Sequence, residues 1–504
     1  MNDGYDVVLF TGCQGSLGKT FGAYKCAHEL RKAGFRTIVI NYLHEFNLHE
    51  LQSLATKAIG SKTLFVGFSN SFLISVPYTQ RYGNIFLPSG AGDEEKFIKF
   101  IKNINPSCKI VIGGCQTFVN IQNPNIDYAV IGYADLSIVN LANHLDRGDQ
   151  LKNSIRTLNR VTVINDPLAS GFDFANSTML WTDDDIVVNN ETLPIEISRG
   201  CIFSCKFCSF PLNGKKQLDY LKNFDTIRDE LIYNYKKYNI THYRILDDTF
   251  NDTEQKLDIM LKIVKSLPFK PRFWAYIRLD LLCKHPHTIQ KLVDIGVHSM
   301  FFGIETLNQS VGKLIGKAFD PVKQIETINY IKKIYGNQVF ILGSFICGLP
   351  TETKESVYNT MNKLYNHEIM LDHAIYNTLS LVKTDHAIWH SAFNLDLRKY
   401  GYRQLPNHAD DTLLNWENDC MTRTDASNMC HTFRSKFISA SHGSVFKTNN
   451  ILHNTHVNSF IPRYKKQAFS HVEKSSKGLP YLVGRTKARL IRLYINIKNK
   501  YFHI

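Results

Sequence analysis

Short apolar runs alternate with amphipathic stretches along residues 1–150. Runs typical of buried strands lie at 5–12, 37–43, 63–69, 109–114 and 127–135, and helical spacing occurs at 20–35, 48–59 and 94–103. This alternation predicts a doubly wound, Rossmann-like parallel sheet of the α/β class. Ligands of such sheets bind beyond the carboxyl ends of the strands. Those ends carry the candidate binding residues Gly12, Ser69, Gly113 and Gly114.

A second alternation runs from about residue 187 to residue 400. Strand-like runs lie at 242–248, 272–280, 298–306, 338–348 and 373–382, with helical stretches at 217–238, 253–266, 286–295 and 321–335. Together with a strand just before residue 200, they make six parallel strands. The pattern predicts a partial (β/α)6 TIM-type barrel with its chemistry at the carboxyl ends of the strands.

These patterns divide the chain into four parts. Residues 1–150 form the Rossmann-like domain, 151–186 a polar linker, 187–400 the barrel, and 401–504 a mainly helical region. We expect the helical region to form a lid over the barrel mouth, because lid segments commonly set substrate specificity. Its Trp416, His431 and Arg434 favour a polar or partly anionic substrate.

Three cysteines with C-x3-C-x2-C spacing are the strongest chemical signal. Cys201, Cys205 and Cys208 lie in "EISRGCIFSCKFCSF". Three thiolates at this spacing hold a 4Fe-4S cluster and leave one iron without a protein ligand. A structural zinc site or three unrelated buried thiols are the alternatives, but zinc needs a fourth ligand and usually pairs of C-x2-C.

The cysteine spacing and its flanks resemble the radical S-adenosylmethionine (SAM) superfamily. The match includes the preceding strand, Ser198-Arg199-Gly200, and Phe207, an aromatic residue that the family places near adenine. The resemblance implies that SAM chelates the open iron and is cleaved reductively to a 5'-deoxyadenosyl radical. It also implies a one-electron donor similar to flavodoxin or ferredoxin.

Polar residues at the predicted strand ends match further positions of that family. The resemblance implies that Asp247 or Asp248 binds the SAM amino group, with a helix cap as the alternative for one of them. Arg278, and Glu305 with Lys317, match motifs facing the SAM pocket, with a salt bridge at the barrel rim as the alternative. In "GSFICGLP" the family's backbone lies against adenine, which implicates Gly343, Ile346 and Gly348.

The first 145 residues resemble the cobalamin-binding-like domain that precedes the barrel in a large radical SAM subfamily. The resemblance lies in "GAYKCAHELRKAGF", "VIGG" and "DYAVIGYAD". The sequence departs from the family because "TGCQGSLG" lacks the histidine of the D-x-H-x-x-G loop. Two possibilities stay open: cobalamin binds without that ligand, or the domain is only a scaffold. A phosphate-binding loop ending at Thr20 is not predicted, because its spacing requires glycine at Cys13.

Composition and charge indicate where the protein is located and what its tail contacts. The 11 cysteines form no disulfide-like framework, which predicts reduced thiols and a cytoplasmic location. No secretion signal or run of about 18 apolar residues is present, so no transmembrane segment is expected. Of the net charge of +14, residues 461–504 contribute 11 Lys or Arg against one acid, Glu473. The tail ends in "ARLIRLYINIKNKYFHI", where Leu490, Leu493, Ile497 and Tyr501 recur at helical spacing. This end of the tail predicts a docking helix or a contact with a polyanion.

Several functions remain open from sequence alone. With cobalamin, the resemblance implies methyl transfer; without it, rearrangement, cyclisation or oxidation. A methylthiotransferase would need a second cysteine set, and Cys13, Cys26, Cys108 and Cys115 lack that family's sequence context. A non-catalytic protein that binds nucleic acid through its basic tail is the remaining alternative.

Overall fold

The structure is a computed structural model of the 504-residue chain. It describes residues 3–12, 18–70, 93–114, 125–152, 154–158, 160–166, 168–189, 191–210, 212–215, 220–317, 320–382, 390–406, 413–440, 457–476 and 490–491. Predicted features at Cys13, at Cys115 and over most of the last 28 residues lie outside these ranges.

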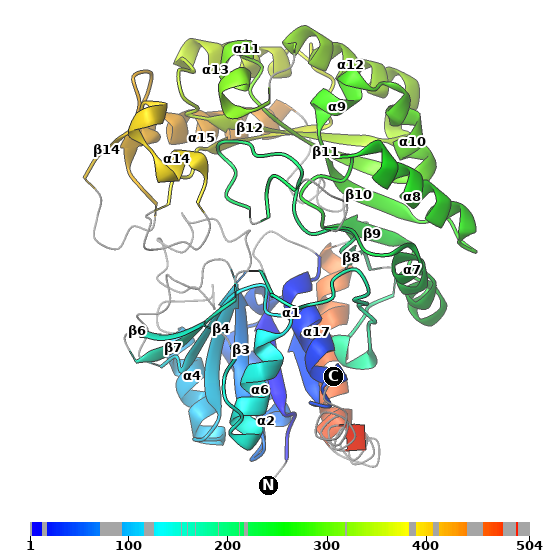
Figure 1. The fold of residues 1–504 in the computed structure, drawn as a ribbon, viewed down its shortest axis with the longest axis vertical. Coiled ribbons are helices and arrows are strands. Elements are labelled where there is room, and N and C mark those ends of the chain that lie inside the picture. The colour runs from blue at the N-terminus through cyan, green and yellow to red at the C-terminus, as the bar shows by residue number, and fades with distance from the viewer. Residues whose placement is uncertain are drawn as a thin grey trace.

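A seven-stranded sheet forms the N-terminal half (Figure 1). Its order is β2 (Thr37–Ile40), β1 (Val7–Thr11), β3 (Phe65–Asn70), β4 (Lys109–Gly114), β5 (Tyr128–Gly132), β7 (Val161–Asp166) and β6 (Ser154–Leu158). All neighbours are parallel except β6 and β7. The central strands are buried on both faces, which explains their unbroken apolar runs. The predicted doubly wound sheet is confirmed.

Helices cover both faces of this sheet. One face packs against α1 (Phe21–Lys32) and α6 (Ser137–Arg147), and the other against α2 (Leu48–Ala58) and α4 (Asp93–Ile104). The start of α2 is set locally, because the Asn47 side chain and Glu50 form a capping box.

Part of the predicted linker belongs to the sheet. Residues 154–166, expected to be polar connecting chain, form β6 and β7. Val161, Val163 and Ile164 are fully buried, and β7 pairs with β5 along its length. The strands are short and carry polar residues on their outer positions, so their alternation is weak in the sequence. The sheet therefore ends at Asp166.

The second sheet has six parallel strands, as predicted. They are β8 (Leu193–Ile195), β9 (His242–Ile245), β10 (Arg272–Ile277), β11 (Val297–Glu305), β12 (Phe340–Cys347) and β13 (His373–Thr378), in that spatial order. The helices between them are α7 (Phe224–Tyr238), α8 (Glu254–Ser266), α9 (Leu279–Lys284), α10 (His287–Ile295), α11 (Gln309–Ile315), α12 (Pro321–Tyr335) and α13 (Lys354–Tyr365). Figure 1 shows the open barrel above the N-terminal sheet.

Helix α15 (Arg423–Ala440) differs from the expected lid. Its Phe433 packs on Tyr376 of β13 and Tyr365 of α13, on the outer, helix-covered face of the barrel. Trp416, in the short hairpin of β14 (Arg403–Gln404) and β15 (Trp416–Glu417), is fully buried. His431 and Arg434 are exposed on the outer helix. His431 and Arg434 therefore do not line the barrel mouth. Trp416 packs beside Gly348 and donates to Leu379 O, just beyond the carboxyl ends of β12 and β13.

The start of the basic tail docks on the N-terminal domain. Helix α17 (Val457–Ser476) buries Ile461, Tyr464, Ala468 and Val472 in the core formed with α2 and α4. Its Lys465 pairs with Glu50 at 2.6 Å. The docking helix was expected at the end of the tail, over 488–504, and apart from residues 490–491 that segment lies outside the described ranges, so it stays a prediction. In the described part of the chain, no helix is long and apolar enough to span a membrane.

Candidate functional site

The cysteine loop connects β8 to α7 and places one hydrogen-bonding neighbour beside each thiol. Asn213 Nδ2 donates to Cys208 Sγ at 3.3 Å, and Arg278 Nη1 donates to Cys205 Sγ at 3.4 Å. Cys201 Sγ lies 3.4 Å from Thr249 Oγ1. Such neighbours stabilise thiolates, the form that binds iron. The donor set therefore fits a cluster ligated by these cysteines.

Burial raises the pKa of Cys201, and raises the pKa of Cys208 to about 11. Iron binding at these thiols would therefore displace protons. Among the described residues, no three Cys, His, Asp or Glu side chains are close enough together to hold one metal ion.

Gly200 shapes the entry into this loop. Its φ is +96°, and a Cβ there would lie 2.5 Å from the carbonyl oxygen of Leu212. The chain then folds back, with Cys208 N donating to Cys205 O and Gly214 N donating to Phe203 O. The glycine of the "SRG" motif is thus required by the backbone conformation and by close packing.

Asp247 and Asp248 follow β9 but have different surroundings. Asp247 is buried, and its carboxylate accepts from Ile197 N, Ser198 N and Ser198 Oγ and pairs with Lys256 at 2.7 Å. Asp248 is only partly buried. Burial, together with the charge of Asp247, raises the pKa of Asp248 to about 7. Asp247 anchors the strand before the cysteines, whereas Asp248 keeps its carboxylate available.

Arg278 joins the cysteine loop to the end of β10. Its guanidinium lies 3.8 Å from the centre of the Phe203 ring and pairs with Asp280 at 2.5 Å. The same group contacts Cys205. Arg278 is thus placed to orient the middle cysteine of the triplet.

Glu305 and Lys317 meet at the end of β11. Their side chains pair at 3.0 Å and occupy the space above Gly303, where a Cβ would lie 2.6 Å from Glu305 Oε1. Lys317 Nζ also lies 5.8 Å from the centre of the Phe207 ring. Glu305 has a φ of +67°, which is uncommon outside glycine and is found at functional sites. The structure thus brings Phe207, Glu305 and Lys317 together.

Gly343 and Ile346 lie within β12, and Gly348 directly follows it. A Cβ on Gly343 would meet Leu371 Cδ1 at 2.5 Å, and a Cβ on Gly348 would meet the Trp416 ring at 2.2 Å. The space beside each glycine is therefore already filled by a protein side chain, Leu371 at Gly343 and Trp416 at Gly348. Ile346, partly exposed, pairs with Asn377 of β13.

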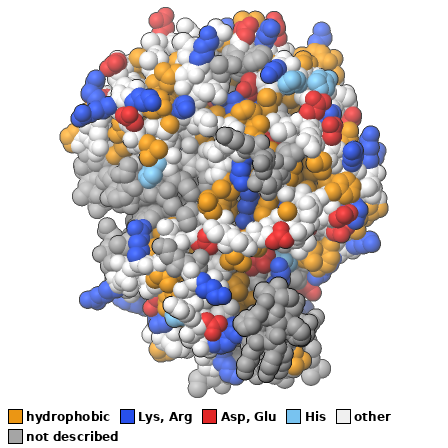
Figure 2. Space-filling view, in the orientation of Figure 1, with side chains coloured by type: hydrophobic (Ala, Val, Ile, Leu, Met, Phe, Trp, Pro, Cys, Tyr) orange, Lys and Arg blue, Asp and Glu red, His pale blue; other side chains and the backbone are white. Residues whose placement is uncertain are grey.

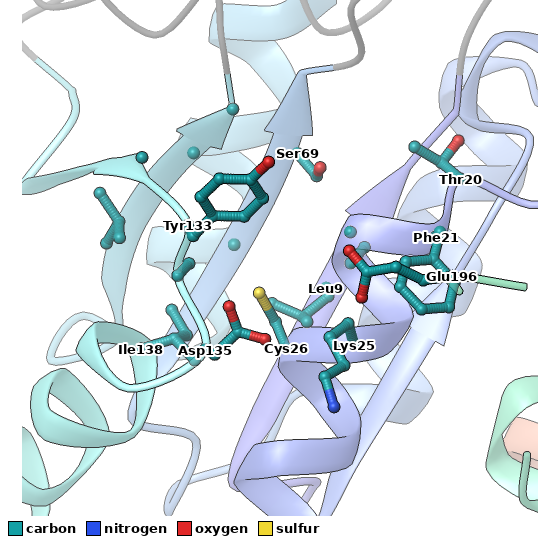
Figure 3. Close-up of a pocket in the computed structure, with 18 of the residues that line it drawn as sticks. Leu9, Thr20, Phe21, Lys25, Cys26, Ser69, Tyr133, Asp135, Ile138 and Glu196 are labelled. Carbon is teal, nitrogen blue, oxygen red and sulfur yellow. The ribbon is translucent and has the colours of Figure 1, made fainter. Parts of the chain in front are cut away.

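A cavity of about 410 Å³ lies between the N-terminal sheet and the barrel. Its sheet side carries Ser69, Gly113 and Gly114 at strand ends, and its barrel side carries Arg244 and Tyr276. Figure 3 shows Cys26 of α1 and Tyr133 and Asp135 from the facing side pointing toward the same space. Gly12 does not line it: a Cβ there would lie 2.6 Å from Leu43 N. None of the described lining residues is a histidine.

Arg199 connects this cavity to the cysteine loop. Its guanidinium donates to both carboxylate oxygens of Asp135, at 2.8 and 3.0 Å, and of Glu196, at 2.7 and 3.1 Å. The rings of Tyr133, Phe172 and Phe174 surround it within 4.6 to 5.5 Å. We call this group the Arg199 clamp. It holds the end of β5 against the segment that leads to Cys201.

Sequence reasoning missed most of the cavity. Tyr133 and Asp135 lie in "DYAVIGYAD" and Arg199 lies in "SRG", but none of the three was proposed as a site residue. Asp135, a charged residue just after a strand that ends in glycine, could have been recognised as a candidate. Arg244 and Tyr276 face the cavity only because the two sheets are stacked. No local pattern marks them.

The sequence model of the radical SAM superfamily matches residues 195–364, which span β8 to α13 and include all three cysteines. Residues 195–364 are a radical SAM domain. The recognition made from the cysteine motif is therefore confirmed.

Relatives of known name include methyltransferases. The uncharacterized methyltransferase PH0819 of Pyrococcus horikoshii is 29% identical over 278 residues, covering 52% of this chain and 59% of that protein. The bacteriochlorophyllide d C-12(1)-methyltransferase of Chlorobaculum tepidum is 22% identical over 182 residues, covering 36% and 39%. This chain therefore aligns with less than two thirds of the length of either relative.

Two solved structures share the fold over nearly the whole chain. TsrM of Kitasatospora setae, a radical SAM methyltransferase with cobalamin and a 4Fe-4S cluster bound, has a TM-score of 0.61 at 12% identity, covering 94% of this chain and 99% of that chain. The cobalamin-dependent radical SAM enzyme OxsB, with aqua-cobalamin and SAM bound, has a TM-score of 0.59 at 14% identity, covering 94% and 71%. The architecture around the radical SAM domain is thus a known one.

Proposed function

We propose that this chain is a radical SAM enzyme that uses a 4Fe-4S cluster, SAM and cobalamin to transfer a methyl group. The observation that carries the proposal is the Arg199 clamp, which joins a cavity at the strand ends of the Rossmann-like sheet to the cysteine loop of the radical SAM domain. The methyltransferase names of its relatives support the same reaction class.

The cluster is proposed at Cys201, Cys205 and Cys208, with Arg278 orienting Cys205. SAM is proposed to bind beside it. Asp248 would accept a charge-assisted hydrogen bond from the SAM ammonium, because the oxygens of Asp247 are already occupied by backbone and Lys256. Phe207, Glu305 and Lys317 would line the same pocket, and Ile346 the adenine side. Gly343 and Gly348 are not included, because Leu371 and Trp416 already fill the space beside them.

Cobalamin is proposed to occupy the cavity between the two sheets. Glycines at the strand ends, Gly113 and Gly114, leave room for a large ligand against the sheet, and most other lining residues are apolar. Bound there, cobalamin would supply the methyl-transfer chemistry, and SAM with the cluster the one-electron chemistry. The protein's part is to hold these sites in register and to exclude water. No histidine is proposed as a cobalt ligand.

A reduced one-electron carrier and a cytoplasmic setting complete the proposal. The test is anaerobic reconstitution with iron, sulfide and hydroxocobalamin, followed by metal analysis, absorbance spectra and a dithionite-driven assay of SAM consumption. We expect about four irons per chain from the chemistry of such clusters, together with retained cobalt. A full cluster without cobalt would leave residues 1–166 as a scaffold and overturn the methyl-transfer assignment.

A matched pair of variants tests the ligands. Cys205→Ala should lose the cluster, whereas Cys283→Ala, a partly buried cysteine on α9, should keep it. A full cluster in the Cys205→Ala protein would contradict the ligand assignment.

A further inference from the structure

The outer side of the cysteine loop lies between two surface elements. Lys206 N donates to Ile315 O at the end of α11, and Phe393 N of α14 (Ala392–Leu395) donates to Lys206 O. Cys205 Sγ lies 4.0 Å from the carbonyl oxygen of Gly316, next to that helix end. The loop that carries the middle cysteine therefore reaches the surface between α11 and α14.

Cations and one apolar side chain dominate the surface of these three segments. Lys313 on α11 and Arg398 and Lys399 after α14 are exposed, Lys206 is partly exposed, and Leu395 is 70% exposed. We call these five residues the basic surface. Residues 202–206, 309–317 and 391–400 hold five Lys or Arg and one acid, Asp396. Figure 2 shows Lys and Arg side chains, with some Asp and Glu side chains among them, on the upper left, where Figure 1 places α14.

The charges of the basic surface are not neutralised within the described part of the chain. Lys317 is the one cation of these segments with an acidic partner there, Glu305. The carboxylate of Asp396 accepts from the backbone N of Lys399, which caps the short turn after α14. Four cations and an exposed leucine on three adjoining segments make a surface that can attract and then pack against an acidic protein surface.

We propose that the basic surface docks the reductant of this enzyme, an acidic one-electron carrier protein such as a flavodoxin. The inference rests on the proposed cluster. One electron would pass from the reduced flavin, which becomes semiquinone, to the cluster, whose charge falls by one. Electron-transfer partners use small, weak interfaces in which opposite charges raise the association rate. The position next to Cys205 shortens the path to the cluster.

The test measures cluster reduction directly, without SAM or substrate. The double variant Arg398→Glu/Lys399→Glu and the single variant Lys313→Glu are mixed anaerobically with flavodoxin hydroquinone, and bleaching of the cluster is followed by stopped flow. At low ionic strength we expect the double variant to lower the second-order rate constant by about tenfold, and added salt to narrow the difference. Leu395→Ala should slow reduction at all salt concentrations.

Two controls separate the possible results. Lys262→Glu/Lys265→Glu makes the same charge change at exposed positions of α8, on the opposite side of the barrel in Figure 1, and should change the rate less than about twofold. Dithionite, which needs no docking surface, should reduce every variant at the wild-type rate. Equal flavodoxin rates in the two double variants would overturn the proposal. A wild-type protein with no cluster to reduce would instead defeat the proposed function itself.

Discussion

Two adjacent carboxylates just after β9, Asp247 and Asp248, have different roles because only Asp247 is held by hydrogen bonds and an ion pair inside the protein. Asp247 points into the protein and is held by Ser198 and Lys256, while Asp248 faces the rim with a pKa raised to about 7. The sequence identified the pair of aspartates but not their different roles, which depend on contacts of Asp247 with Ser198 and Lys256, far away in the chain.

This difference in roles predicts the pH dependence of SAM binding. A cationic ligand needs Asp248 ionised, so the affinity for SAM should rise as pH increases toward 7 and level off above it. Asp248→Asn should bind SAM about tenfold more weakly at pH 8 and lose this pH dependence. Anaerobic titration calorimetry from pH 6 to pH 8 measures both effects. An unchanged pH profile in the variant would exclude Asp248 as the titrating group.

Asp247→Asn should behave differently. It leaves the buried ammonium of Lys256 with Asp252 as its remaining carboxylate, so we expect lower stability instead of a selective loss of SAM affinity. Denaturant unfolding measures this change. A fully stable Asp247→Asn protein with weakened SAM binding would reverse the two roles.

Gly348 offers a second test at the residue scale. Gly348→Ala places a Cβ 2.2 Å from the Trp416 ring at a φ of +100°, so both overpacking and backbone strain destabilise the variant. We expect a loss of about 2 to 4 kcal/mol in the free energy of unfolding. Gly401→Ala is the matched control, because it has φ +77° but nothing within 4 Å, and should lose about 1 kcal/mol. Equal losses would show that the contact with Trp416 contributes nothing.

Elements with strong periodicity were predictable, and elements defined by distant partners were not. The six barrel strands and helices α7, α8, α10 and α12 appear close to where the apolar spacing placed them, whereas α9, α11 and α13 were not predicted. Strands β6 and β7 were missed because their short sequences alternate only weakly. In the structure β7 is held by pairing with β5, and β6 by pairing with β7. The position of α15 also depends on distant partners. Its Phe433 packs on Tyr365 of α13 and Tyr376 of β13, and the weak amphipathicity of the helix itself did not reveal these contacts.

At the element scale, α17 should stabilise the N-terminal domain. Tyr464 is fully buried and its hydroxyl accepts from Asn41 N at 2.8 Å, so Tyr464→Ala should cost about 3 to 4 kcal/mol of unfolding free energy. Lys466→Ala, exposed on the same helix, should leave stability unchanged. Chemical denaturation of both variants makes the comparison. Equal stabilities would contradict the docking of α17.

For the whole molecule, one hydrophobic core crosses the boundary between the halves. Leu9 and Val39 of the N-terminal sheet and Ile195 and Ile245 of the barrel belong to the same buried cluster. The sequence could not show this continuity, because it results from stacking two sheets whose strands are each predicted separately. The Arg199 clamp adds a polar connection across the same boundary.

Removing the clamp should weaken that boundary. Arg199→Gln leaves the carboxylates of Asp135 and Glu196 facing each other without their buried cation, and we expect a loss of about 3 to 5 kcal/mol. Arg228→Gln, which breaks only surface pairs with Asp225 and Asp229, should show no measurable change. Thermal unfolding followed by calorimetry should also show whether the two halves still melt together. A single unshifted transition in Arg199→Gln would contradict the clamp.

The contact between Asn41 and Tyr464 joins residues 423 positions apart. During synthesis the chain grows from its N-terminus, so β1 and β2 leave the ribosome long before α17 exists. Until then, the apolar surface of the first domain that α17 covers stays open to water and to other chains. A truncated product that ends after the barrel would carry that exposed surface permanently, and it would be prone to aggregation and degradation although every strand of both sheets is present.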